Sequence, residues 1–167
     1  MPEAGRVVHP LAPIIDSECR VLVLGTMPSP KSREVGFYYG NPQNRFWRVM
    51  AAIFDEPLPQ TNEERRALCL RHHVALSDVL KSCTIAGASD SSIQDPVPND
   101  IAALLAQAPI DSVFCTGTTA TRLYQRLVEP VCGVAAVGLP STSPANARMR
   151  LDDLIRAYEP LRRAAEG

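Results

Sequence analysis

Short apolar runs alternate along the chain with segments of helical spacing. The apolar runs are typical of strands buried in a parallel sheet, and they predict strands at about 20–24, 74–80, 112–116 and 134–139. Helices are expected between and after them, at about 42–54, 61–72, 99–107 and 149–165. This order predicts an α/β fold, a three-layer α/β/α sandwich around a mainly parallel four-stranded sheet.

Capping residues set the expected helix starts. Asn41 before Pro42 reads as an N-cap with proline at the first helical position. Thr61 followed by Glu64 forms a capping box at the start of the second helix. The last helix, 149–165, carries apolar residues at helical spacing and is expected to be continuous.

The loop expected at 25–40 is rich in unusual residues. It holds two prolines, three glycines and the pair Tyr38–Tyr39, a composition that favours a binding loop over a plain connection. An aromatic ring offers a face on which a planar base can stack, and a helix N-terminus favours negative charge. Because this loop and the one after 134–139 both follow strands, we expect them to meet at the ligand-binding edge of the sheet.

Two further segments are predicted to lie outside these main strands and helices. Residues 1–17 contain several prolines and read as an extended lead-in, in which Arg6 and His9 carry only a minor expectation of function. Residues 81–99 read as a long polar loop that is more apt to bind than merely to connect. Asp78 lies just before it, near the carboxyl end of a strand, a common place for site residues.

Composition narrows the class of protein. The 167 residues fit one domain, 1–167, and a net charge of −1 requires any nucleic-acid affinity to come from local patches. The five cysteines include no C-x-x-C pair, so we expect reduced thiols and no metal or cofactor. No membrane-spanning stretch or signal is visible, and we expect a monomeric cytoplasmic protein with no membrane partner.

Two motifs resemble a known family. The first comprises GTMPS at Gly25–Ser29 and GFYYGNPQNRFW at Gly36–Trp47, and the second is LPSTSPANA at Leu139–Ala147 with the helix after it. They are similar to the motifs of the uracil-DNA glycosylase superfamily, especially its mismatch-specific uracil and hypoxanthine-DNA glycosylases. The resemblance spans almost the whole chain in the right order. It implies that DNA containing deaminated bases is the partner.

The resemblance also implies roles for single residues of the first motif. Tyr39 matches the family's stacking aromatic, although Tyr38 or Phe37 would take that place if the loop register shifted. Asn44 aligns with an asparagine implicated in catalysis, where an amide can orient water or stabilise the leaving base. Asn41 is the second catalytic candidate, with helix capping as its alternative.

Other residues of the base pocket follow from the same alignment. Met27 stands where several branches carry a catalytic asparagine or aspartate, and methionine cannot activate water. The backbone N–H groups of 26–29 could still hydrogen-bond the departing base, so Thr26, Met27 and Ser29 are base-binding candidates. Ser89, Asp90, Ser91 and Ser92 correspond to a segment beside the base pocket, but Asp90 and the serines could equally make only turn hydrogen bonds.

The second motif is expected to hold DNA. Its hydroxyls and backbone amides suit phosphates, its proline and asparagine could fill the gap left by an extruded nucleotide, and its arginine could pair with a phosphate. The residues concerned are Ser141, Thr142, Ser143, Pro144, Asn146 and Arg148. The alternative is an ordinary proline-containing loop.

Together these features predict a monofunctional DNA glycosylase acting on hypoxanthine or uracil in base excision repair. No lysine stands at a motif position suited to a Schiff base, so strand cleavage is not expected. Two alternatives stay open: a damage-binding module of the same fold with little turnover, suggested by Met27, and an α/β domain that binds a free mononucleotide.

Overall fold

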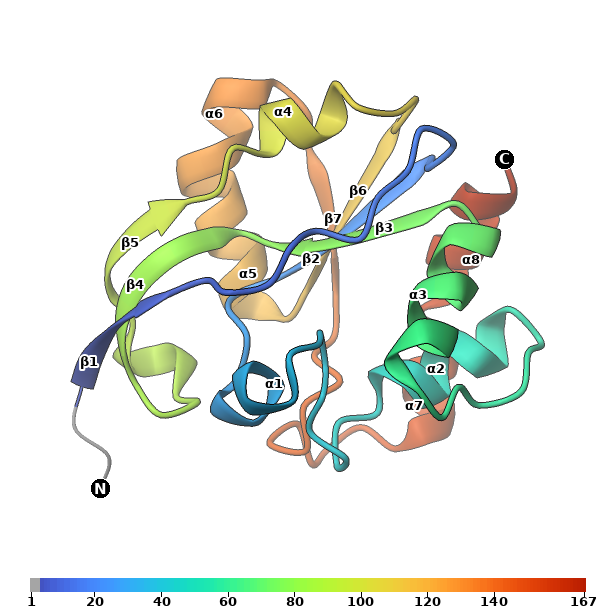
Figure 1. The fold of residues 1–167 in the computed structure, drawn as a ribbon, viewed down its shortest axis with the longest axis horizontal. Coiled ribbons are helices and arrows are strands. Elements are labelled where there is room, and N and C mark those ends of the chain that lie inside the picture. Colours follow the sequence, from blue (N-terminus) through green and yellow to red (C-terminus); the bar gives the residue numbers. More distant parts are fainter. Residues whose placement is uncertain (1–3) are drawn as a thin grey trace.

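Four parallel strands form the central sheet, in the order β3-β2-β6-β7 (Figure 1). The computed structural model describes residues 4–167, so the first three residues of the predicted lead-in lie outside the described part. The strands are β2 Val21–Gly25, β3 Val74–Asp78, β6 Ser112–Thr116 and β7 Ala136–Leu139. The predicted four-stranded parallel sheet is therefore confirmed, with its strands close to their predicted limits.

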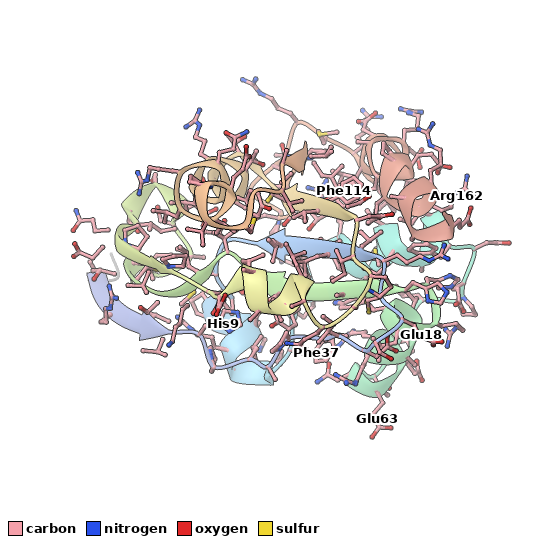
Figure 2. The ribbon with its side chains drawn as sticks, turned by 90° about the horizontal axis from the view of Figure 1, so that it is seen from above. His9, Glu18, Phe37, Glu63, Phe114 and Arg162 are labelled. Carbon is pink, nitrogen blue, oxygen red and sulfur yellow. The ribbon has the colours of Figure 1, made fainter. Side chains whose placement is uncertain are left out.

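Helices cover both faces of this sheet. One face carries α2 Phe46–Ile53, α3 Asn62–Arg71, α7 Leu151–Ala157 and α8 Glu159–Glu166. The other carries α4 Ile101–Leu105, α5 Thr118–Leu123, a π-helical turn Tyr124–Val128 and α6 Glu129–Cys132. Figure 2 shows Phe114 of β6 inside these layers, whereas Glu63 of α3 points into solvent. The α/β/α sandwich is confirmed.

Alternate residues of β2 face opposite helical layers. Val21 and Val23 belong to the core under α2 and α8, and Leu22 and Leu24 belong to the core under α4 and α5. All four are fully buried. This two-sided burial explains why the strand reads as one continuous apolar run.

A second, three-stranded antiparallel sheet was not predicted. It has the order β1-β4-β5, from β1 Ala4–Val8, β4 Leu80–Ala86 and β5 Gln94–Pro98, with a short 3₁₀ helix at Asp90–Ser92. The prediction that 81–99 is a long polar loop is wrong. Serine and threonine in β4 hid its buried positions, and the prolines of β5 are tolerated because it is an edge strand.

Two predicted helix limits are also wrong. The first helix begins at Phe46 instead of Pro42, because Asn41 does not cap it: the Asn41 Oδ1 accepts the Gln43 N–H in a local turn. The closing helix is broken at Tyr158 into α7 and α8. Pro160 has no N–H and its ring would clash with a preceding helical turn, so α7 cannot continue past it, and Pro160 lies instead in the first turn of α8. The helix capped by Thr61 is confirmed, since its Oγ1 accepts the Glu64 N–H at 3.1 Å.

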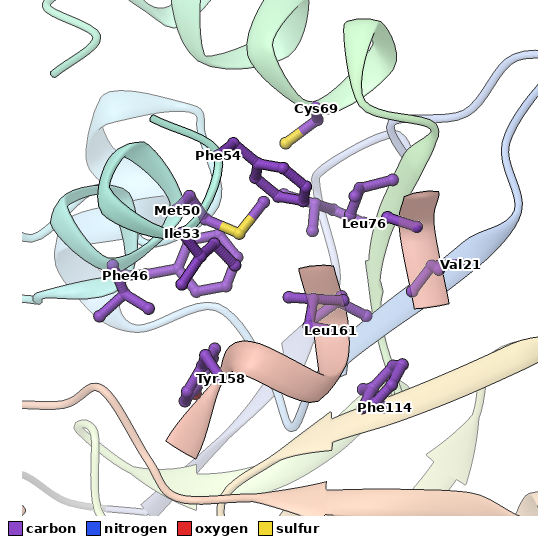
Figure 3. Packing of buried hydrophobic residues seen from close by; sticks show 14 of the residues in the cluster. Val21, Phe46, Met50, Ile53, Phe54, Cys69, Leu76, Phe114, Tyr158 and Leu161 are labelled. Carbon is purple, nitrogen blue, oxygen red and sulfur yellow. The ribbon is translucent and has the colours of Figure 1, made fainter. Parts of the chain in front are cut away.

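The helices α2, α7 and α8 share one cluster of buried apolar side chains (Figure 3). Phe46, Met50 and Ile53 of α2 pack in one cluster with Tyr158 and Leu161. The Tyr158 hydroxyl donates to the Pro140 carbonyl at 2.6 Å, which ties the helix junction to the start of the second motif. Within residues 4–167, no helix is both long and apolar enough to cross a membrane.

Leu154→Ala tests this packing. Leu154 is fully buried on α7, so its truncation should lower the free energy of unfolding by about 2–5 kcal/mol, measured by urea denaturation. Val131→Ala is the control, because Val131 is 78% exposed and its truncation should change stability by less than about 0.5 kcal/mol. Equal effects of the two changes would contradict this assignment of the core.

Candidate functional site

A cavity of about 340 Å³ lies at the carboxyl ends of β2, β3 and β6, between the two motif loops. The first loop contributes Thr26, Met27, Ser29, Tyr39, Asn41 and Asn44 to its wall, and the second contributes Ser141, Thr142, Ser143 and Pro144. Figure 1 shows the segment after β7 running beside α1 and the start of α2. The predicted meeting of the two loops is confirmed. A volume of this size suits a small planar ligand.

The first loop is rigid because it contains a short helix that sequence reasoning missed. This helix, α1 Pro30–Val35, is capped by the Ser29 hydroxyl and ends at Gly36 in the left-handed conformation. Buried Ser32 accepts hydrogen bonds from the Ser29 hydroxyl and from the Gly40 N–H. The signal was a serine and proline followed six residues later by glycine, the usual start and stop of a helix.

Tyr39 forms part of the cavity wall. Its backbone has a φ of 53°, a strained value for an aromatic residue of the kind often found at functional sites. One face of its ring stacks on Phe46, with centroids 3.8 Å apart, and its hydroxyl lies 3.1 Å from the Thr116 Oγ1. Burial, followed by the nearby Asp78 carboxylate, raises the pKa of Tyr39 well above its usual value. The tyrosine is therefore a fixed, neutral wall.

The neighbouring aromatic residues play structural parts. Tyr38 is 3% exposed, and its hydroxyl donates to the Ala12 carbonyl. The Trp47 indole donates to the Tyr38 carbonyl. Phe46 and Trp47 also belong to the core, since both are buried.

Asn44 joins the two loops and has a fixed amide orientation. Its Oδ1 accepts the Phe46 N–H at 2.9 Å and the Thr142 hydroxyl at 2.8 Å. A backbone N–H can only donate, so this atom must be the carbonyl oxygen. The Asn44 Nδ2 has no acceptor within residues 4–167, which leaves two N–H donors for a ligand.

Arg45 holds the second loop, a role that sequence reasoning missed. Its guanidinium donates to the carbonyl oxygens of Thr142, Ser143, Asn146 and Met149. Its backbone N–H also donates to the Thr142 carbonyl, at 3.1 Å. The signal lay inside the Asn-Arg-Phe-Trp sequence, but no local pattern indicates carbonyl partners about a hundred residues away.

Five predicted site residues lie outside the cavity wall. Ser92 accepts the Ala86 N–H and donates to the Ser89 carbonyl, and the Ser91 hydroxyl pairs with that of Ser89. These three serines therefore make the turn hydrogen bonds of the alternative interpretation, while Asp90 of the same segment lies in the wall. The remaining two are in the second loop: Asn146 donates to the Ser141 carbonyl, and Arg148 is exposed.

Two aspartates also line the cavity, one on its floor and one at its rim. Asp78 lines the cavity from the end of β3, and its Oδ2 lies 2.7 Å from the His9 Nε2. Both side chains are 5% exposed. At the rim, Asp90 has a raised pKa, chiefly because its carboxyl is partly desolvated; Thr26 opposes this rise and Asp78 adds to it. Within residues 4–167, no three His, Cys, Asp or Glu side chains gather to form a metal site.

Arg45→Met should loosen the second loop. Methionine removes the guanidinium donor from the four carbonyl oxygens, so the amides of 141–147 should exchange with deuterium at least about tenfold faster, if the clamp contributes about 1.5 kcal/mol or more. Arg48→Met is the control, because exposed Arg48 donates only to Pro42. Unchanged exchange in Arg45→Met, measured by mass spectrometry, would contradict the clamp.

Comparisons with known proteins agree with this geometry. A hypoxanthine DNA glycosylase of Methanosarcina acetivorans is 33% identical over 136 residues, covering 81% of this chain and 85% of that protein. A hypoxanthine DNA glycosylase of Methanosarcina barkeri is 36% identical over 137 residues, covering 81% and 86%.

A solution structure and a family model extend the likeness. The structure, of a uracil DNA glycosylase candidate from Methanosarcina acetivorans, superposes with a TM-score of 0.81 at 28% identity, covering 95% of this chain and 98% of the other. The sequence model of the uracil DNA glycosylase superfamily matches residues 12–162. The chain therefore belongs to the uracil DNA glycosylase superfamily.

Proposed function

We propose that the chain is a DNA glycosylase that hydrolyses the N-glycosidic bond of deaminated bases, hypoxanthine foremost and uracil second, in base excision repair. Its superfamily and two relatives named hypoxanthine DNA glycosylases support the reaction. The observation that carries it is the single cavity built by two loops distant in sequence, into which Asn44 presents an unused amide group.

The cavity fits the first requirement of the reaction, which is to hold a nucleotide rotated out of the duplex. Tyr39 forms one wall and is fixed by Phe46 behind it, so only its other face is open to a base. The second loop, with Ser141 to Ser143, lies beside this opening, where its hydroxyls and amides suit the flanking phosphates. Pro144 at the exposed tip is our candidate for filling the gap in the duplex, and exposed Arg148 for pairing with a phosphate.

Hydrogen-bond donors then fit the second requirement, stabilisation of a leaving base that becomes anionic. The Asn44 Nδ2 supplies two N–H groups. Within residues 4–167, the backbone N–H groups of Thr26, Met27 and Ser29 also lack acceptors. Donors already in place cost no rearrangement in the transition state. We therefore favour leaving-group stabilisation over water activation by Asn44, since its carbonyl oxygen is occupied twice.

Met27 favours one alternative, a module that binds damaged DNA with little turnover. Its thioether lines the cavity at the motif position discussed above and cannot activate water. Tight binding of an inosine duplex without base release would select this alternative. We further propose that no Schiff base forms, since neither Lys31 nor Lys81 lines the cavity.

We also propose that the protein acts as a monomer in the cytoplasm. The thiols fit a reducing compartment such as the cytoplasm, because burial raises the pKa of Cys19 to about 11 and that of Cys115 to about 12. Such thiols stay protonated and unreactive, as expected for structural cysteines in a reducing compartment.

Base release is the direct test of the activity. Incubation with labelled duplexes containing inosine or uracil, followed by alkali, should yield a cleaved strand, whereas omission of alkali should leave it intact. If folded protein releases neither base, the proposed activity is wrong.

Asn44→Asp tests the catalytic role. Aspartate keeps an oxygen for the Phe46 N–H and the Thr142 hydroxyl but replaces the amide donors with an acceptor. We expect single-turnover release of hypoxanthine to fall by about 10²–10³-fold. Gln43→Glu makes the same chemical change at an exposed neighbour and should have little effect. Full activity of Asn44→Asp would show instead that a carboxylate can serve here, as water activation would require.

A further inference from the structure

Asp78 is a buried carboxylate with one oxygen engaged and the other free. The residue is 4% exposed and lines the cavity from the end of β3. Its Oδ2 pairs with His9, whereas its Oδ1 has no hydrogen-bond donor within residues 4–167. The Asn99 amide donates to the backbone carbonyls of Asp78 and Leu80, which fixes the chain on both sides of the carboxylate.

The hydrogen bonds of His9 show which group donates in the His9–Asp78 pair. The backbone N–H of Leu11 donates to the His9 Nδ1 at 3.2 Å, so Nδ1 is an acceptor. In a neutral imidazole the other nitrogen then carries the proton, and Nε2–H donates to the Asp78 Oδ2. This arrangement makes the Asp78 Oδ2 an acceptor and leaves Oδ1 to face the cavity without a donor.

The free oxygen lies on the cavity floor beside Tyr39. A Cβ added to Gly25 would come within 2.5 Å of the Asp78 Oδ1 and 3.2 Å of the Tyr39 hydroxyl. Because Gly25 has no side chain, the Asp78 Oδ1 has room to lie at this position. The negative charge contributes to the raised pKa of both Tyr39 and Asp90, the groups on either side of the cavity.

Deamination changes the hydrogen-bonding edge of a base in a way that a carboxylate can read. Adenine has an acceptor at N1 and cytosine has one at N3. Their deamination products, hypoxanthine and uracil, carry an N–H donor at the same ring position. A buried acceptor therefore forms a hydrogen bond with hypoxanthine or uracil. In adenine or cytosine it would instead face another acceptor, and no hydrogen bond could form.

We propose that the Asp78 Oδ1 is the specificity-determining acceptor for the ring N–H of the everted base, and that His9 is its positioning residue. The proposal rests on the proposed glycosylase function and adds the chemical rule for substrate choice. It explains with one atom why a single pocket would take a purine and a pyrimidine that share little except that N–H. Asp90 does not fill this role as well, since it lies exposed at the rim.

Asp78→Asn should replace the acceptor that this residue presents to the base with a donor. The His9 Nε2–H requires an acceptor, so the new amide should turn its oxygen to His9 and present its NH₂ to the base. The probes are duplexes with inosine or with unsubstituted purine 2′-deoxyriboside, whose N1 is an acceptor. Dissociation constants are measured in an Asn44→Ala background to prevent release.

We expect Asp78→Asn to weaken inosine binding by about 10–100-fold and to place purine ahead of inosine. Asp111→Asn, the same change at an exposed residue just before the start of β6, should keep the original order. An equal loss for both duplexes, or an unchanged order in a protein with native circular dichroism, would overturn the proposal. If the wild-type chain releases hypoxanthine in those cases, the proposed function still stands.

His9→Leu added to Asp78→Asn tests the positioning role. Without its donor, the amide can rotate and present its carbonyl oxygen, so the preference for inosine should return in part. No recovery in a folded protein would overturn the part assigned to His9.

Discussion

The whole site depends on one cation and the carbonyl oxygens around it. Within residues 4–167, the Arg45 guanidinium has no carboxylate partner and donates to carbonyl oxygens of the second-motif loop, and Asn44 beside it accepts the Thr142 hydroxyl. A charged donor shared among carbonyl dipoles fixes the position of a whole loop and not of one side chain. Because Phe46 follows directly and belongs to the core, the helix that buries it also sets the direction of Arg45. Packing and site geometry are therefore coupled through three consecutive residues.

The cavity carries opposite hydrogen-bonding character at its two ends. The motif loop offers donors from Asn44 and from the backbone near Met27, whereas the floor offers the acceptor oxygen of Asp78. Donors favour the negative charge that develops on a leaving base, and the carboxylate opposes it. On our account, this arrangement gives up some rate and gains discrimination between deaminated and normal bases. Such discrimination matters for an enzyme whose substrate is rare among normal bases.

Sequence reasoning located the sheet and the two loops because these depend on local patterns. The apolar run at 21–24 predicts a doubly covered strand in any context, and motif residues after a strand lie at its carboxyl edge. Sequence reasoning failed where the contacting residues are far apart in the sequence. The pairing of β4 with β1 and β5 and the contact of His9 with Asp78 depend on strand register, which no single sequence displays. The turn that replaces the cap at Asn41 depends on a tertiary demand, the placement of Asn44 against Thr142.

The most direct test of the account is the structure of the protein bound to a duplex carrying an inosine analogue that resists hydrolysis. We predict an everted base with one face on Tyr39, its N1–H within hydrogen-bond distance of the Asp78 Oδ1, and the Asn44 Nδ2 facing the leaving base. A base held outside this cavity, or one whose N1 edge points away from β3, would contradict the account.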